Sequence, residues 1–180
     1  MSIKNKNKEE LLSNSSTIGY KGIVTIDYIR KNEIVKTIKV HNKGNKSLFS
    51  FLVTCLEGRL IDGMRPKILR VYNCTKSETT KYTEAVTTPI IYTSARALDT
   101  SIVYKFLIPA TAIRKDTKGN YYELNHFRLF STDNDSQDSS LDDCCAYVDL
   151  TTGISPDGVT NYLITWTLQI TNIESTGDSN

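Results

Sequence analysis

The chain has 180 residues, of which 39% are hydrophobic, and its 22 basic and 20 acidic residues leave a formal net charge of +2. This length suits one domain with a core of its own, and the charge balance excludes a whole-molecule attraction to nucleic acid, which needs a clustered basic surface. No apolar run approaches the ~18 residues of a membrane span, and no apolar signal-peptide core follows the basic start. We therefore expect no nucleic-acid partner, no membrane partner, and synthesis in a reducing cytoplasm.

Residues 1–19 are predicted to form a polar N-terminal arm. The segment is too polar to bury a core of its own, so it would not fold in isolation. We expect the arm to contribute no strand to the folded domain and to bind a partner through its few apolar side chains, which are Ile3, Leu11, Leu12 and Ile18.

A hairpin and a short helix are predicted next. GIVTIDYI and IVKTIKV both alternate in the manner of strands, and the polar turn 30–33 separates them. Asn45 is a predicted N-cap, and Gly58 is the predicted left-handed stop of the helix. The apolar stripe of this helix consists of Leu48, Phe49, Leu52, Cys55 and Leu56.

The rest of the chain contains only strand and turn patterns. The predicted strands are Ile68–Tyr72, Val86–Thr93, Ser101–Ile108, Tyr121–Phe130, Ala146–Leu150 and Asn161–Asn172. The segment 152–158 has the composition of a turn that leads into the last strand. In that last strand the apolar residues fall on one face and the polar residues mostly on the other, which predicts one buried and one solvated side. The side chains predicted to be critical for the core are Trp166, Tyr162, Ile164, Leu168 and Phe106.

About eight strands and one short helix predict a mainly β fold, an antiparallel β-sandwich with one short α-helix. Residues 20–172 would form this sandwich, and residues 173–180 would form a polar C-terminal tail.

The acidic loop 133–143 does not match the calcium loop of an EF-hand. Its carboxylates are Asp133, Asp135, Asp138, Asp142 and Asp143. An EF-hand calcium loop needs Gly at its sixth position and Glu at its twelfth, and counting from Asp133 those positions hold Asp138 and Cys144. A solvated surface loop is the favoured interpretation, with an irregular calcium site or a partner contact as alternatives.

Cysteine and histidine patterns favour neither a metal site nor catalysis. The chain has no CxxC pair for zinc, and neighbouring cysteines in a strand point to opposite faces. We expect free thiols at Cys55, Cys74, Cys144 and Cys145. His126 alternates with apolar neighbours and is predicted to be a partly buried side chain with satisfied hydrogen bonds. No GxSxG, P-loop or HExxH motif is present, so we expect no enzyme, no metal and no cofactor.

Two blocks of the chain carry a resemblance. GIVTIDYIRKNEIVKTIKVHNKGNKSLFSFLVTCLEG is similar to the opening of fibre-like or accessory virion proteins of tailed bacteriophages, crAss-like phages in particular. SIVYKFLIPATAI, YYELNHFRLF, AYVDL and NYLITWTLQITN together look like the closing half of head-fibre and fibre-adaptor modules. The resemblance covers most of residues 20–172. It departs at Asn125 and His126, where such modules usually carry a Gly-containing turn.

The resemblance implies a non-enzymatic virion structural protein, made in the host cytoplasm, as a head fibre or a head-decoration component. A tail or neck collar protein and a fibre adaptor are alternatives. The expected partners are further copies in a homodimer or homotrimer, and a major capsid or collar protein. A carbohydrate-binding receptor module is an alternative of another class, with exposed aromatic candidates at Tyr82, Tyr92, Tyr121 and Tyr122.

Overall fold

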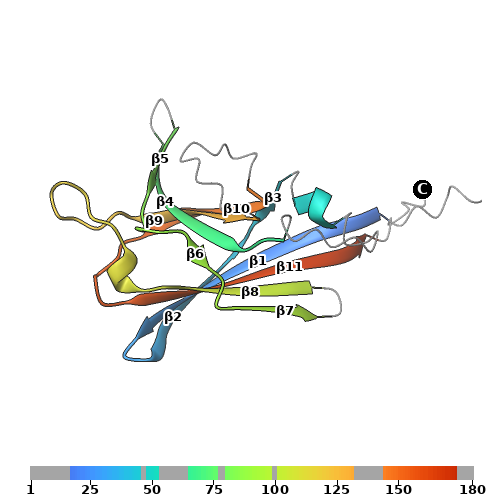
Figure 1. Ribbon diagram of the computed structural model, residues 1–180, viewed down its shortest axis with the longest axis horizontal. Coiled ribbons are helices and arrows are strands. Elements are labelled where there is room, and N and C mark those ends of the chain that lie inside the picture. Colours follow the sequence, from blue (N-terminus) through green and yellow to red (C-terminus); the bar gives the residue numbers. More distant parts are fainter. Residues whose placement is uncertain are drawn as a thin grey trace, which may run out of the picture.

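The computed structural model describes residues 17–45, 48–52, 65–76, 80–98, 101–131 and 144–173. Within these residues the fold is mainly β and contains one short α-helix, as predicted. Two antiparallel sheets lie one above the other in a sandwich-like arrangement (Figure 1).

The first sheet has five strands in the order β2-β1-β11-β8-β7. Its strands are β1 (Thr17–Arg30), β2 (Glu33–His41), β7 (Ser94–Leu98), β8 (Ser101–Ile108) and β11 (Asn161–Ile173). The predicted hairpin is confirmed as β1 and β2. Its turn consists of Lys31 and Asn32, both with positive φ, at 51° and 65°. Two successive left-handed residues give the twist of a tight two-residue hairpin turn.

The second sheet has the order β3-β10-β9-β4-β5, with β6 paired to β4. Its strands are β3 (Lys43–Gly44), β4 (Ile68–Lys76), β5 (Thr80–Glu84), β6 (Ile90–Ile91), β9 (Leu124–Phe130) and β10 (Ala146–Ile154). A short 3₁₀ turn, η2 (Ala110–Ala112), follows β8.

Strand β11 is the central strand of the first sheet, and its predicted alternation is confirmed. Tyr162, Ile164, Trp166 and Leu168 are buried, and the residues between them are half-buried because strands flank β11 on both sides. All five side chains predicted for the core, Trp166, Tyr162, Ile164, Leu168 and Phe106, are no more than 2% exposed.

Several strands differ from the prediction: β9 begins at Leu124 rather than Tyr121, β4 continues to Lys76, and β10 continues to Ile154, into the predicted turn 152–158. The predicted strand 86–93 contains only an isolated bridge at Val86 and the two-residue β6. Pro89 interrupts it, because proline donates no hydrogen bond to a ladder. The two-residue strand β3 was not predicted, and neither were strands β5 and β7. The latter two carry mainly exposed or half-buried side chains, so neither shows the alternation of a half-buried strand.

The boundaries of the sandwich also differ from the prediction. Strand β1 begins at Thr17, so residues 17–19 of the predicted arm belong to the first sheet, where Thr17 pairs with Ile173. Backbone pairing does not depend on side-chain polarity, so a polar segment continues the ladder wherever a partner strand runs beside it. Of the predicted partner-binding residues, Ile18 is opposite Asn172 in this ladder. Residues 3, 11 and 12 lie outside the described residues.

Residues 48–52 are helical. Leu48, Phe51 and Leu52 are buried, whereas Phe49 is 49% exposed. Positions 48, 51 and 52 share one face of a helix and position 49 does not, so Phe51 replaces Phe49 in the buried stripe. Phe49 instead packs edge-on against Tyr20, with 6.2 Å between ring centroids. Cys55, Leu56 and Gly58 of the predicted helix lie outside the described residues.

Candidate functional site

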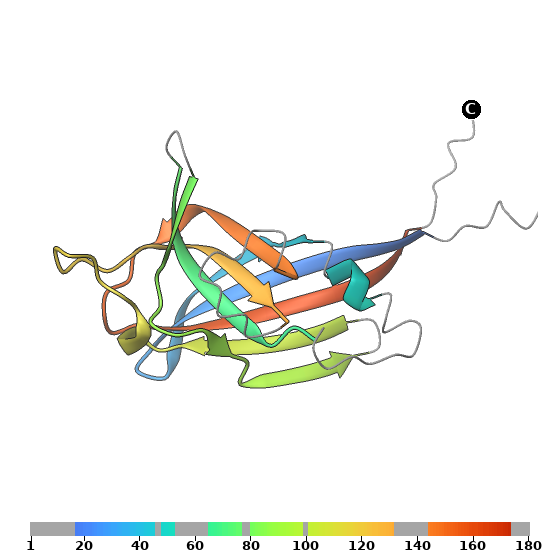
Figure 2. The ribbon, with the colours of Figure 1, turned by 45° about the horizontal axis from the view of Figure 1, so that its top comes forward.

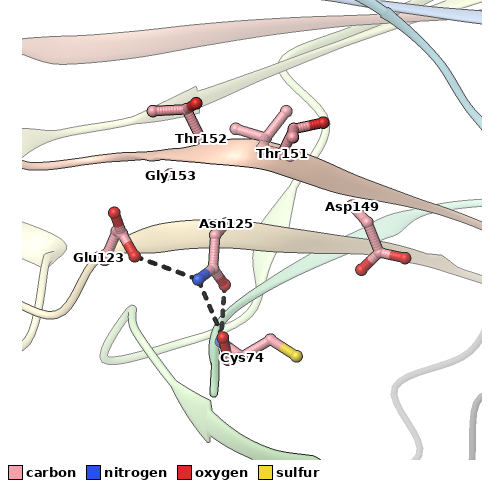
Figure 3. Close-up of a pocket in the computed structure, with 8 residues that line it drawn as sticks. Cys74, Glu123, Asn125, Asp149, Thr151, Thr152 and Gly153 are labelled. Carbon is pink, nitrogen blue, oxygen red and sulfur yellow. Dashed lines mark hydrogen bonds between the residues drawn. The ribbon is translucent and has the colours of Figure 1, made fainter. Parts of the chain in front are cut away.

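A pocket of about 500 Å³ lies where β10 bulges away from β9 (Figure 3). Asp149 pairs with His126, and the next pair is Ile154 with Leu124. The four residues 150–153 of β10 are therefore opposite a single residue of β9, Asn125. Extra residues on one strand bend it away from its partner, and the space left here is lined by Cys74, Glu123, Asn125, Asp149, Leu150, Thr151, Thr152 and Gly153.

Asn125 fixes one wall of this pocket. Its Oδ1 accepts the Cys74 backbone N–H at 2.6 Å, and its Nδ2 donates to the Cys74 carbonyl at 3.0 Å. The β4–β9 ladder ends at the pair Tyr72–His126, so the Asn125 amide extends the connection between the strands by one further step. The same Nδ2 donates to Glu123 Oε2 at 3.3 Å (Figure 3). Asn125 thereby joins the backbone of β4 to a carboxylate of the pocket.

The Glu123 side chain also packs against Gly153 of β10. A Cβ atom at position 153 would overlap the Glu123 side chain, including its carboxyl carbon. Glu123 therefore packs directly on the backbone of β10, and a larger residue at position 153 would displace the end of the Glu123 side chain. The carboxylate of Glu123 is positioned by this contact and by Asn125 before any ligand arrives.

The second carboxylate of the pocket, Asp149, is held by a buried chain of side chains. His126 Nδ1 and Asp149 Oδ1 are 2.6 Å apart, and Arg128 Nε donates to His126 Nε2 at 2.8 Å. Because Nε2 accepts, the imidazole proton is on Nδ1 and is donated to Asp149, which makes His126 a neutral bridge. His126 is 0% exposed and Arg128 is 4% exposed. The prediction of a satisfied His126 is confirmed, but its side chain is fully buried rather than partly buried.

Aromatic rings surround the hydrogen-bonded side chains of His126 and Arg128, on the face of the second sheet that points away from the core. The guanidinium carbon of Arg128 lies 4.2 Å from the Tyr82 ring centroid and 4.7 Å from that of Tyr72. The His126 ring is 4.7 Å from Tyr82 and 5.9 Å from Tyr147. Ring faces attract a guanidinium and offset part of its desolvation. Burial raises the pKa of Tyr82, so the phenol stays neutral in this cluster.

Chemically, the pocket presents two carboxylates, a side-chain amide and the hydroxyl-bearing residues Thr151 and Thr152 around one hollow. Such a set matches the hydroxyl groups of a polyol better than an apolar ligand, because each hydroxyl both donates and accepts. Within the described part of the chain, no three His, Cys, Asp or Glu side chains lie together as metal ligands. Both ring nitrogens of His126 are already hydrogen-bonded, so the imidazole is not placed to accept a proton from a ligand.

The tyrosines considered for carbohydrate binding have different surroundings. Tyr82 stacks on Arg128 and His126. Tyr92 packs on the buried Tyr104, and Lys115 Nζ lies 4.5 Å from the ring centroid of Tyr121. None of them lines the pocket, which uses Glu123, Asn125 and Asp149 instead. Sequence reasoning missed these residues, since the bulge that gathers them leaves no pattern in the sequence.

The predicted free thiols are buried where the structure describes them. Cys74, Cys144 and Cys145 are buried and form no disulfide. Burial raises the pKa of Cys144 to about 12, and Asn45 Nδ2 donates to its sulfur at 3.2 Å. Cys55 and the acidic loop 133–143 lie outside the described residues.

The two ends of the sandwich differ. At the terminal pole, Thr17 pairs with Ile173, so β1 begins and β11 ends side by side (Figures 1 and 2). At the opposite distal pole, Asp157 accepts hydrogen bonds from the backbone N–H of Val159 and of Thr160, and it pairs with Arg30 of the hairpin. These bonds, the one from Val159 first, hold the pKa of Asp157 well below its ordinary value.

The distal pole also exposes aliphatic side chains. Ile34 and Val35, just after the hairpin turn, are 60% and 57% exposed, and Val159 is 64% exposed. The Arg30–Asp157 pair ties the hairpin to the loop that carries Val159. The hairpin and the loop that carry these aliphatic side chains are therefore held together by an ion pair.

Comparisons with known proteins give no match: no protein-family model, curated protein or solved structure matches this chain. Among the helical residues that the structure describes, none belong to a helix that is long and apolar enough to cross a membrane.

Proposed function

We propose that this chain is a non-enzymatic structural protein of a tailed-phage virion, a head fibre or head-decoration component that is attached through its N-terminal arm. The observation that supports this most is the pairing of β1 with β11 from Thr17–Ile173 to Ile29–Asn161. The two longest strands form one stiff ribbon, and both terminal segments leave it at the terminal pole. The distal pole then points away from the attachment point and carries its aliphatic side chains outward.

The construction of the sandwich fits a passive mechanical role. Large buried rings fill the space between the sheets, among them Trp166, Tyr162 and Phe106. Burying ~150–250 Å² per aromatic side chain gives a small domain a rigid interior. The partners in this proposal are further copies in a dimer or trimer, and a major capsid or collar protein of the virion.

Deletion of the arm tests the proposal. A variant that lacks residues 1–16 keeps every residue of β1, whereas a deletion through Gly19 also removes the first three residues of that strand. We expect the 1–16 deletion to leave the melting temperature unchanged and to abolish incorporation into particles when it is co-expressed with the virion proteins. A deletion of residues 174–180 is the matched control, since it removes the other segment that follows the terminal pole. Equal incorporation of the arm deletion and the full chain would refute attachment through the arm.

Two alternatives, a tail or neck collar protein and a fibre adaptor, are also structural proteins. For them the arm deletion has the same expected result, but the arm would bind a different virion protein. Affinity capture of the full chain with each purified virion protein separates them. Binding to a capsid protein supports the head position, and binding only to a collar or tail protein supports the alternatives.

A carbohydrate-binding receptor module is a second candidate function, favoured by the β10 pocket. Two fixed carboxylates, an amide and two threonines surround a hollow of a size that accepts a monosaccharide. Saturation-transfer NMR with a panel of sugars tests it, with Glu123→Gln and Asp149→Asn as variants that should lose the signal. Asp116→Asn is the control, because Asp116 belongs to the turn 116–120 and is not among the residues that line the pocket. Absence of any sugar signal from the wild-type chain would remove this candidate.

A further inference from the structure

A second hollow, of about 310 Å³, lies along the edge strand β7. Ala95 pairs with Tyr104 and Ala97 pairs with Ile102, so small methyl groups stand beside large side chains of β8. The short alanines leave space, and Phe51 of the helical segment 48–52 closes it from the opposite side. The floor of this groove is therefore apolar.

The outer edge of β7 is open to a further strand. β7 is the last strand in the order of its sheet, and all five of its side chains are exposed. The other edge strand, β2, carries Glu33, Lys36 and Lys39, which is the usual protection of an edge against strand addition. β7 carries a single charge, Arg96. The β7 edge is thus the less protected of the two.

Two arginines flank the groove, and each is available for an anion. Arg65 and Arg96 both line it, and Arg96 belongs to the opposite face of β7 from Ala95 and Ala97. Among the other arginines of the described residues, Arg30, Arg70 and Arg128 have polar side-chain partners, such as Glu84 for Arg70 at 2.8 Å, whereas Arg114 makes no ion pair there. Neither Arg65 nor Arg96 makes an ion pair or a side-chain hydrogen bond in the part of the chain that the structure describes. An apolar floor between two unpaired cations is complementary to an acidic segment with an apolar residue.

The Leu98 end of β7 lies near the terminal pole. The strand register places Leu98 opposite Ser101, Ser101 opposite Gln169, and Gln169 opposite Lys21. The end of β7 is thus level with Lys21, near the start of the β1–β11 ladder at Thr17. A second molecule that lies beside this one, with the two terminal poles at the same level, can bring its own arm to the β7 edge.

We propose that the segment Glu9–Leu12 of the N-terminal arm of a second copy binds along β7. Its sequence, EELL, places acidic residues directly before apolar ones. In an added strand successive side chains alternate, so Glu10 and Leu12 share one side while Glu9 faces the other. Glu10 then meets Arg65, Leu12 enters the apolar floor, and Glu9 meets Arg96. Reciprocal exchange of arms gives a symmetric dimer, and this inference rests on the adhesive arm of the proposed function.

A charge-swap experiment tests the contact. Sedimentation velocity should show a dimer of the full chain, and Arg65→Glu with Arg96→Glu should weaken association roughly tenfold or more, because like charges then face each other. Glu9→Lys with Glu10→Lys should weaken it similarly. Combining all four substitutions should restore the dimer. Lys36→Glu with Lys39→Glu, which reverses two charges on the opposite edge, is the matched control and should leave association unchanged.

A fluorescent peptide of residues 5–16 provides a second measurement. Fluorescence anisotropy should detect its binding to the chain that lacks residues 1–16, and the two arginine substitutions should abolish that binding. Failure of the four-fold variant to restore the dimer, or a monomeric full chain, would overturn the exchange of arms between copies. Particle incorporation is scored separately: a dimer that never enters particles contradicts the proposed function alone, and incorporation of a monomer contradicts this inference alone.

Discussion

Replacement of Trp166 should reveal how much of the stability depends on the centre of β11. The indole is 0% exposed and lies between Val24 of β1 and Tyr104 of β8 in the strand register. Truncating a buried Trp to Ala costs about 3–5 kcal/mol, from lost transfer energy and the cavity that remains. A domain of this size is stable by about 5–15 kcal/mol. Trp166→Ala should therefore lower the melting temperature by roughly 6–20 °C, at about 2–4 °C for each kcal/mol.

Trp166→Phe offers a graded comparison. Trp166 Nε1 is buried and has no hydrogen-bond partner in the described residues. Phenylalanine keeps most of the ring and removes that unpaired donor, so its cost should be clearly smaller than that of alanine. Thr165→Ala, on the other face of β11, should change stability by no more than about 1 kcal/mol.

Urea unfolding followed by far-UV circular dichroism measures all three variants. Indole fluorescence is unsuitable, because Trp166 is the only tryptophan of the chain. The reasoning fails if Trp166→Ala unfolds at the same urea concentration as Thr165→Ala. It also fails if phenylalanine costs as much as alanine, since the cost would then not follow the volume removed.

Three further changes have defined outcomes. Gly153→Ala should displace the flexible end of the Glu123 side chain and change the free energy of unfolding by no more than about 1 kcal/mol, as measured by urea unfolding with Thr152→Ala as control; a loss of several kcal/mol would show that Glu123 cannot move aside. The lowered pKa of Asp157 means that its stabilising effect is present above the ordinary Asp pKa of about 3.9 and is lost as the pH falls. Thermal melts from pH 7 to pH 3 should therefore show a weaker acid dependence in Asp157→Asn than in wild type, and parallel curves would count against it. The acidic loop should not bind calcium. Melting temperatures should therefore be equal with and without calcium, both in wild type and in a variant with Asn at Asp133, Asp135 and Asp138. A calcium-dependent rise in the melting temperature that the variant loses would show a calcium site.

The long strands could be predicted because their pattern reflects burial directly. β11 lies in the middle of a sheet with one face on the core, so Trp166 and its neighbours alternate with polar residues. Edge strands carry no such pattern: β7 is exposed along its whole length, and the sequence SARAL does not distinguish it from a loop. Only the pairing with β8, which depends on the tertiary fold, makes it a strand.

The pocket could not be predicted for a related reason. Gly153 was assigned to a turn, whereas it lies inside β10 and gives up its side-chain space to Glu123. The contact between His126 and Asp149 depends on the register of β9 against β10 across a long connection. The sequence predicts that His126 is satisfied, but it does not name the partner, because strand register is set by packing and not by local spacing.

The pairing of Thr17 with Ile173 also has a consequence for how the chain folds. The ladder between β1 and β11 joins the two ends of the described chain, so nearly the whole polypeptide must be closed into a loop before it forms. Contacts of such long separation slow folding, since loop closure costs entropy before the contacts repay it. Cross-strand partners lie about 5 Å apart, so a short linker can join Ile173 to Thr17 once residues 1–16 and 174–180 are removed, and new ends can be opened at the Lys31–Asn32 turn. This circular permutant converts β11 and β1 into a local hairpin, and it should refold faster than the parent chain while it keeps the same core.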